Sequence, residues 1–274
     1  MMHRVAVIQM NSRDVLEDNL AQAESLLVRA ANAGAVLAVL PENFAMFAPN
    51  VQRTTAARIE EISDRLSDIA RRTGLWLVAG SIPSAARPDG VPVPEGRVRS
   101  AGLVLDATGR VQARYDKIHL FDAQVADAQS SYRESATFEP GDDVVCLDTP
   151  AGRLGLAICY DLRFPELFLA LRRQGAELIA VPAAFTKVTG EAHWQVLLRA
   201  RAIESQCYLL GAGQVGVHSG TRETWGHSQI IDPWGRVLAE LSAPEPDFCT
   251  AECDLVALAE LRRQMPLLSH RRLC

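Results

Sequence analysis

The 274-residue chain has no apolar stretch that approaches the length of a membrane-spanning helix, so a protein inserted in a membrane is not expected. It also has no block of like charges, and its formal net charge is −5. Nucleic acid and anionic membrane surfaces attract proteins with basic patches, so neither is expected as a main partner. The hydrophobic content of 48% is enough for the sizeable core of a globular protein.

The chain lacks the cysteine spacing of a disulfide framework or a zinc site. Its six cysteines are scattered, most of them within apolar runs, and only Cys249 and Cys253 lie close together. That pair has no second pair and no histidine cluster nearby, so no metal site is expected. The N-terminus enters a strand pattern at Arg4 without the layout of a signal peptide. Reduced thiols and a cytoplasmic location are therefore predicted.

Strand-like and helix-like patterns alternate along the chain, and the same order occurs twice. Each half is predicted to contain strand, helix, strand, helix, strand and then a hairpin. In the first half, strands are expected at 4–9, 36–40 and 75–79, helices at 16–30 and 59–69, and a hairpin at 98–116. In the second half, strands are expected at 144–148, 153–159, 177–181 and 207–212, helices after Pro165 and at 191–205, and a hairpin at 227–241.

Two similar halves of this kind favour an α/β protein whose two sheets pack against each other, each covered by helices on one face. The predicted fold is therefore a four-layer α-β-β-α sandwich that forms a single domain over residues 1–274. The stretch at 139–143 is too short to be a convincing linker between two domains. Segments 84–97 and 120–140 are predicted loops, and loops that long in a compact domain are often functional.

Cys159 ends the apolar strand-like run at 153–159, and a helix start follows it closely. A strand fixes the backbone of such a thiol, and the free N–H groups and partial positive charge of a helix start favour a thiolate and an oxyanion. Cysteine is also among the most buried residue types, so an inert core thiol is the competing interpretation. The choice between them depends on whether the chain supplies a base and an oxyanion partner.

Glu42 and Lys117 are two further reactive side chains that follow predicted strands. Ligands of open α/β sheets collect at the carboxyl ends of strands, so both groups are expected to converge with Cys159 at one edge of the sandwich. Cys159 would attack a carbonyl-type carbon, while a buried Glu42 would accept the thiol proton and return it to a leaving amine. Lys117 and the backbone N–H of Tyr160 would stabilise the oxyanion.

Each of these residues also has a simpler interpretation. Glu42 could merely cap a turn, and Lys117 could be a solvated charge at the end of a strand. A histidine is the usual partner of a catalytic thiol, but no sequence feature connects Cys159 with any of the candidates, which are His119, His193 and His227. A Cys–His–Asp arrangement therefore stays open at this point.

Three motifs make the chain similar to the nitrilase superfamily of carbon–nitrogen hydrolases over essentially its full length. They are Leu-Pro-Glu-Asn at 40–43, Tyr-Asp-Lys-Ile-His-Leu-Phe-Asp at 115–122 and Gly-Leu-Ala-Ile-Cys-Tyr-Asp-Leu-Arg-Phe-Pro-Glu at 155–166. The resemblance implies the four-layer sandwich and a catalytic triad of Glu42, Lys117 and Cys159. It also implies a second glutamate, Glu134, which orients Lys117 and helps to position the substrate nitrogen.

Within the superfamily, the chain most resembles the branch that contains deaminated glutathione amidase and the omega-amidases. Segments 185–204, 225–228 and 232–235 support this branch, and Arg-Phe-Pro-Glu at 163–166 favours deaminated glutathione amidase. The branch implies a small-molecule amide substrate that carries carboxylate groups, so a cation is expected in the pocket.

Arg163 is the first candidate for that cation because it lies four residues from Cys159, and Arg199 and Arg201 are weaker candidates. The alternative role of Arg163 is an ion pair with the nearby carboxylate of Glu166 or Asp161. Two residues that follow a proline at a strand end are expected in the pocket wall, and these are Phe185 and Thr186.

The expected activity is hydrolysis of an amide through a thioester on Cys159, without a metal or an organic cofactor. Alternatives within the superfamily are an omega-amidase, an N-carbamoyl amino acid hydrolase and a nitrilase that acts on true nitriles. An inactive member that serves as an interaction partner is the alternative from another class, and the intact set of four reactive residues weighs against it. Family members typically pair, so a homodimer is expected, with the helix at 165–173 and the C-terminal segment as candidate contacts.

Overall fold

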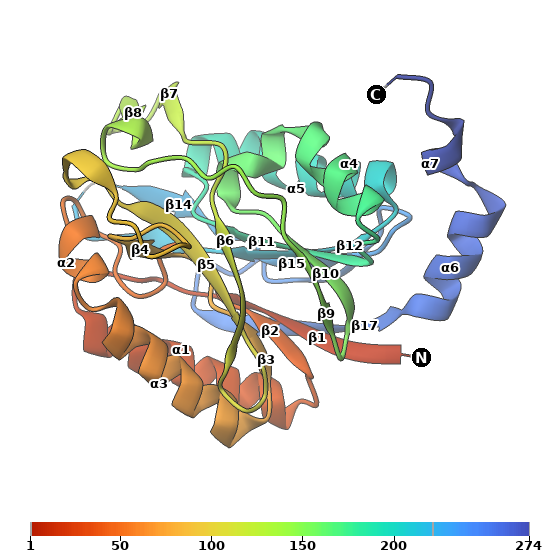
Figure 1. Ribbon diagram of the computed structural model, residues 1–274, viewed down its shortest axis with the longest axis horizontal. Coiled ribbons are helices and arrows are strands. Elements are labelled where there is room, and N and C mark those ends of the chain that lie inside the picture. Colours follow the sequence, from red (N-terminus) through yellow and green to blue (C-terminus); the bar gives the residue numbers. More distant parts are fainter. Residues whose placement is uncertain (1, 221, 274) are drawn as a thin grey trace.

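Two mixed β-sheets lie face to face between two pairs of helices in the computed structural model, which describes residues 2–220 and 222–273 (Figure 1). Helices α1 (Leu16–Asn32) and α3 (Ile59–Thr73) cover one sheet, and α4 (Pro165–Arg173) and α5 (Lys187–Ser205) cover the other. This arrangement confirms the predicted four-layer α-β-β-α sandwich. In the described part of the chain, no helix combines the length and the apolar character that crossing a membrane requires.

The first sheet has seven strands in the order β17-β1-β2-β3-β5-β4, and β6 pairs with β5 outside this path. Its strands are β1 (Met2–Gln9), β2 (Leu37–Val39), β3 (Trp76–Val78), β4 (Ile82–Ser84), β5 (Arg99–Leu105), β6 (Val111–Asp116) and β17 (Asp247–Asp254). β1, β2 and β3 are parallel, because helical crossovers connect them. β17 returns from the far end of the chain to pair antiparallel with all of β1.

The second sheet has six strands in the order β16-β15-β12-β11-β10-β9. They are β9 (Cys146–Thr149), β10 (Gly152–Leu156), β11 (Leu178–Ala183), β12 (Tyr208–Gly213), β15 (Gln229–Ile231) and β16 (Val237–Glu240). β10, β11 and β12 are parallel, and β15 and β16 form the antiparallel hairpin. From β10 onward, the second half therefore repeats the order strand, helix, strand, helix, strand of the first half, and β9 is an additional strand before it.

The central strands are buried on both faces, which explains why they appear in the sequence as nearly continuous apolar runs. Val5 and Val7 of β1 point into the core between the two sheets. Ala6 and Ile8 of the same strand point the other way, into the core formed with α1 and α3. Successive side chains of a strand alternate between its faces, so one strand contributes to two layers of core.

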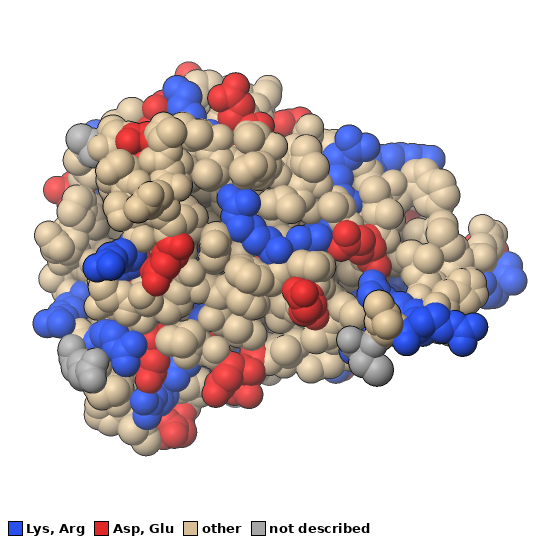
Figure 2. Space-filling view, turned by 90° about the horizontal axis from the view of Figure 1, so that it is seen from above, with Lys and Arg blue, Asp and Glu red and all other residues tan. Residues whose placement is uncertain are grey.

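Several short elements lie outside the predicted ones. They are α2 (Gln52–Ala56), the hairpin of β7 (Asp122–Gln124) and β8 (Ser131–Arg133), the hairpin of β13 (Val215–Val217) and β14 (Glu223–Trp225), α6 (Leu255–Gln264) and α7 (Leu267–His270). Figure 1 places α2, β7, β8 and β14 at one end of the sandwich and α6 and α7 at the other. Basic and acidic side chains are interspersed over most of the face shown in Figure 2, and basic ones are more frequent toward the α6–α7 end.

Two predicted boundaries differ from the structure near the site. Helix α5 begins at Lys187 instead of residue 191, because the Thr186 side chain caps it by accepting a hydrogen bond from the Thr189 N–H. Strand β10 ends at Leu156, so Cys159 does not end the strand. It opens a 3₁₀ turn that covers 159–163 and leads into α4.

Candidate active site

Glu42, Lys117 and Cys159 follow β2, β6 and β10, and the fold buries all three side chains. Their residues keep exposed fractions of only 3%, 2% and 8%. The segment that carries Glu42 is packed tightly against the end of β3, where Gly80 has a φ of +52°. A Cβ at Gly80 would lie 1.9 Å from the carbonyl oxygen of Pro41. Only glycine allows this close approach, which holds the Glu42 backbone in place.

The ammonium group of Lys117 is held between two carboxylates. Its Nζ donates to Glu42 Oε1 at 2.8 Å and to both oxygens of Glu134 at 2.9 Å. Burial alone would lower the pKa of Lys117, but the charges of Glu134 and Glu42 outweigh it and raise this pKa well above its usual value. Lys117 therefore stays a cation, as a group that stabilises an oxyanion must.

Glu134 shares the ammonium group of Lys117 with Glu42. The backbone N–H of Phe121 donates to Glu134 Oε2 at 2.6 Å and fixes the second carboxylate. Burial raises the pKa of Glu134, and the negative charge of Glu42 raises it further against the opposing attraction of Lys117. Glu134 therefore takes up a proton more readily than an exposed carboxylate would.

Cys159 has a φ of +50°, in the left-handed region that few non-glycine residues adopt. It opens a turn, so the N–H of Tyr160 lies at the start of that turn beside the thiol. Burial raises the pKa of the Cys159 thiol well above its usual value, and Glu42 raises it further while Lys117 opposes the change. This raised pKa disagrees with a thiolate favoured by the helix start and agrees with the expectation that Glu42 accepts the thiol proton. The thiol keeps its proton and needs a base at the moment of attack.

Asp161 connects the Cys159 turn with the segment that carries the lysine. Its fully buried carboxylate accepts hydrogen bonds from the Tyr115 hydroxyl at 2.7 Å and from the Ile158 N–H at 2.8 Å. The backbone N–H of His119 donates to the same carboxylate at 3.0 Å. These hydrogen bonds stabilise the buried negative charge of Asp161. They also hold the Cys159 turn close to the segment that carries Lys117.

The three histidines considered as thiol partners have other contacts, and none of them lines the pocket that contains Cys159. A ring nitrogen of His119 contacts Asp161, and one of His193 contacts Arg163. A ring nitrogen of His227 contacts Glu240. A fourth histidine, His218, does line the pocket, but its ring nitrogens lie 2.7 Å from the Ser12 carbonyl and 2.6 Å from the Thr224 hydroxyl. Burial lowers the pKa of His218 to about 4, so its ring is neutral near neutral pH.

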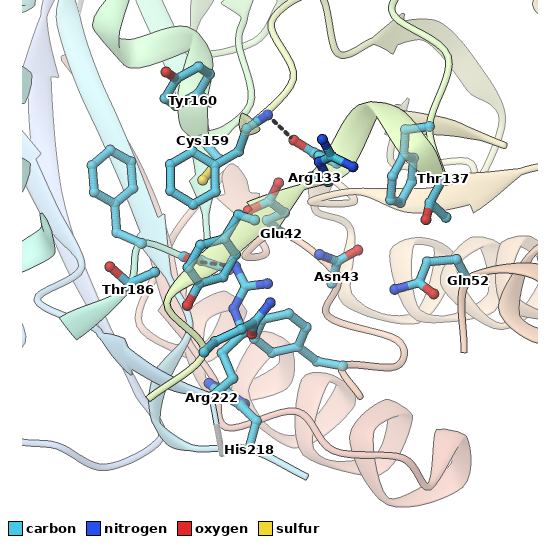
Figure 3. A pocket seen from close by; sticks show the side chains of 18 of the residues that line it. Glu42, Asn43, Gln52, Arg133, Thr137, Cys159, Tyr160, Thr186, His218 and Arg222 are labelled. Atoms are coloured by element: carbon cyan, nitrogen blue, oxygen red, sulfur yellow. Dashed lines mark hydrogen bonds between the residues drawn. The ribbon is translucent and has the colours of Figure 1, made fainter. Parts of the chain in front are cut away.

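A pocket of about 390 Å³ opens onto the thiol, a size typical of small-molecule sites (Figure 3). Its lining includes every site residue that the sequence analysis singled out, namely Glu42, Lys117, Glu134, Cys159, Tyr160, Arg163, Phe185 and Thr186. The last two come from the end of β11 and the start of α5, close to the positions expected for the pocket wall.

Arg163 packs on aromatic rings and does not form the ion pair considered as its alternative role. Its guanidinium lies 5.6 Å from the ring centroid of Tyr160 and 5.3 Å from that of Phe185. Among the described residues, no carboxylate comes within ion-pair distance of it. Arg199 and Arg201 donate to backbone carbonyls elsewhere and do not line the pocket.

Sequence reasoning missed a set of lining residues that come from three short segments. They are Phe47, Ala48, Pro49, Gln52, Gln129, Tyr132, Arg133, His218, Ser219 and Arg222. The predicted loop at 120–140 supplies part of the wall, whereas no described residue of the loop at 84–97 lines it. Tyr132 and Arg133 directly precede Glu134, so an aromatic and a cation beside a motif residue were a usable signal. The segments at 47–52 and 218–222 carry no comparable signal.

The family described as carbon-nitrogen hydrolase matches residues 4–263 of the chain. The protein belongs to this family. It is 45% identical to the deaminated glutathione amidase of Yersinia enterocolitica, with 98% of this chain and 92% of the relative covered. The nitrilase and fragile histidine triad fusion protein of Caenorhabditis elegans matches in structure with a TM-score of 0.90 and 39% identity over 99% of this chain, which spans 65% of that longer protein.

A Saccharomyces cerevisiae protein from branch 10 of the nitrilase superfamily has a TM-score of 0.86 at 28% identity, with 99% of this chain and 97% of the relative covered. This carbon–nitrogen hydrolase is therefore an enzyme of the nitrilase superfamily that acts on bonds other than peptide bonds. Within the described residues, no group of three or more His, Cys, Asp or Glu side chains is arranged to hold a metal ion.

Proposed function

We propose that the protein is an amidase that hydrolyses a small carboxylate-bearing amide, with deaminated glutathione as the substrate. The observation that carries this proposal is the hydrogen-bonded cluster of Glu42, Lys117 and Glu134, which lines an arginine-containing pocket together with Cys159. The name of the Yersinia relative supports the choice of substrate. Deaminated glutathione keeps both carboxylates of glutathione, one at each end, and this matches a pocket with several unpaired cations.

In the first half of the proposed reaction, Cys159 attacks the carbon of the side-chain amide while Glu42 takes the thiol proton. The new C–S bond places negative charge on the carbonyl oxygen, which Lys117 and the N–H of Tyr160 stabilise. The C–N bond then breaks, and Glu42 returns the proton to the leaving amine. The acyl group remains on Cys159 as a thioester.

In the second half, a water molecule attacks the thioester carbon while Glu42 accepts one of the water protons. The C–S bond breaks, the acid is released, and the sulfur regains a proton from Glu42. Glu134 stays bonded to Lys117 through both halves and keeps the ammonium group in position. All steps use side chains of this chain, so the proposal includes no cofactor.

Arg163 is proposed to bind a carboxylate of the substrate. Its guanidinium is held by the rings of Tyr160 and Phe185 and has no carboxylate partner among the described residues. Phe185 and Thr186 are proposed to form the wall along which the acyl part lies. A planar guanidinium fixed in this way can donate two parallel hydrogen bonds to a carboxylate.

We also propose that the chain acts as a single domain and as a homodimer in the cytoplasm. Pairing through the face of α4 and α5 is supported by apolar side chains exposed on α5, such as Val196 at 67% and Ile203 at 46%. The C-terminal segment is the second candidate contact. The free thiols of the described cysteines support a reducing compartment.

Parallel assays on three kinds of amide test the proposed activity. We expect the highest kcat/KM on deaminated glutathione, a lower value on an alpha-ketoglutaramate-type amide and the lowest on a carbamoyl amino acid. A higher value on either of the last two would replace the proposal with an omega-amidase or a carbamoyl hydrolase. Absence of turnover on all amides would favour an inactive interaction partner.

A further inference from the structure

Arg222 is a pocket cation that no carboxylate neutralises among the described residues. It directly precedes β14, and its guanidinium lies 4.7 Å from the ring centroid of Phe47 and 5.2 Å from that of Tyr132. Its Nη2 donates to the carbonyl oxygen of Ala184 over 3.3 Å, and its Nε is buried without a hydrogen-bond partner. A guanidinium that is held in place by two rings, and that has N–H groups not used in other hydrogen bonds, is well suited to bind an anion.

The charges of the pocket wall favour a ligand with more than one negative group. Four cations, Lys117, Arg133, Arg163 and Arg222, face two carboxylates, Glu42 and Glu134. Lys117 contacts both carboxylates, so neither carboxylate of the pocket wall is paired with an arginine. This surplus of positive charge in the pocket occurs in a protein whose net charge is −5.

Arg163 and Arg222 approach the thiol from different walls. Arg163 packs on Tyr160, and Figure 3 shows Tyr160 and Arg222 on opposite sides of Cys159. Both walls meet the short stretch after β11: Arg222 bonds to the Ala184 carbonyl, and Arg163 stacks on the next residue, Phe185. A substrate amide held at Cys159 therefore has one arginine on each side.

The positions of Glu42 and of the turn that begins with Cys159 distinguish the two sides. Glu42, which protonates the leaving amine in the proposed reaction, lies in the same segment as Phe47, on which Arg222 stacks. Glu42 and the ring that holds Arg222 therefore come from one segment, which favours this side of the pocket for the leaving amine. Arg163 belongs to the turn that begins with Cys159, where the acyl group stays attached. Arg133 is exposed, so it is less firmly placed than either of the other two arginines.

We propose that Arg222 binds a carboxylate carried by the leaving amine, while Arg163 binds the carboxylate of the acyl part. This inference rests on the proposed function and assigns one residue, Arg222, to the acid group on the amine side of the scissile bond. Deaminated glutathione has such a group, because its glycine carboxylate belongs to the leaving amine. An amide whose leaving group is ammonia would leave Arg222 without a ligand, so we expect the larger substrate to be preferred.

The test compares deaminated glutathione with an analogue whose glycine carboxylate is a carboxamide. We expect the wild type to favour the acid about 10- to 100-fold in kcat/KM, mainly through KM, as for a hydrogen-bonded charge pair. Arg222→Gln should lose most of this preference, and Arg222→Lys should recover part of it. Arg236→Gln, which removes an exposed arginine outside the pocket, is the matched control and should keep the preference.

A retained preference for the acid in Arg222→Gln would overturn the assignment of Arg222. Binding of the acid and the carboxamide to a Cys159→Ala background, measured by calorimetry, separates this result from a failure of the proposed reaction, because binding needs no turnover. If the wild type fails to hydrolyse deaminated glutathione while binding still discriminates through Arg222, the reaction is wrong and the assignment stands. If neither kinetics nor binding discriminates the two ligands, the assignment is wrong.

Discussion

Replacing Cys159 by alanine is expected to lower amide hydrolysis by roughly 10⁴-fold or more, because the covalent step loses its nucleophile. The fold should remain, since Lys117 keeps both of its carboxylate partners and alanine has the same backbone requirements as cysteine at a φ of +50°. The measurement is kcat on deaminated glutathione, together with the thermal unfolding midpoint of both proteins.

Cys146→Ala is the matched control for this variant. Cys146 lies on β9, is only partly buried and does not line the pocket, so its replacement should leave turnover near the wild-type value. Equal losses in the two variants would indicate a general effect of removing a thiol. Retention of most activity in Cys159→Ala would show that the chemistry proceeds without a thioester on this residue.

Glu42→Gln is expected to lower kcat by about 10²- to 10⁴-fold, because one side chain serves as base for the thiol and as acid for the leaving amine. The same substitution should lower the pKa of Cys159, since the negative charge of Glu42 raises it in the wild type. The variant should therefore ionise its thiol at a lower pH and still turn over more slowly. The pH dependence of thiol alkylation, measured beside the pH–rate profile, gives both quantities.

Glu166→Gln provides the control for Glu42→Gln, because Glu166 is an exposed carboxylate on α4 near the same turn. It removes a negative charge without touching the pocket, so neither kcat nor the pKa of Cys159 should change much. A Glu42→Gln variant with near wild-type kcat would exclude Glu42 as the proton carrier. A thiol that ionised only at a higher pH than in the wild type would contradict the electrostatic account of the cluster.

The sandwich and the reactive cluster could be predicted because their signals are local. Strands buried on both faces leave apolar runs, and Glu42 and Cys159 lie just after such runs. Lys117 instead follows β6, a mixed strand whose first residues are exposed. The contact of Glu134 with Lys117 could be predicted only from the resemblance to a family, because it depends on the conformation of the loop at 120–140. The protonated state of Cys159 was not predictable from its place in the sequence, because burial and the charge of Glu42 outweigh any effect of the turn.

The C-terminal elements escaped prediction because their stability comes from distant contacts. β17 has a mixed polar sequence and is partly exposed, and its pairing with β1 joins residues at opposite ends of the chain, such as Met2 with Asp254. A local signal for α6 was present and overlooked. Asp254 caps this helix by accepting hydrogen bonds from the N–H groups of Val256 and Ala257, and an aspartate before a helical apolar pattern is typical of a helix start.

Arg222 shows the limit of sequence reasoning most clearly. Its position in the pocket depends on stacking with Phe47 and Tyr132, which lie far from it in the sequence and in two other segments. No spacing rule relates these three residues. A surplus of cations in the pocket therefore becomes visible only when the tertiary structure brings the walls together.

Mass spectrometry of the intact protein mixed with deaminated glutathione, stopped by acid during turnover, tests the central claim most directly. The account predicts an adduct with the mass of the acyl group, located by peptide mapping on the segment that contains Cys159, together with the released amine. The adduct should be absent from Cys159→Ala. Release of the acid without any adduct on Cys159, or an adduct on another cysteine that is needed for turnover, would contradict a mechanism in which Glu42 activates this thiol.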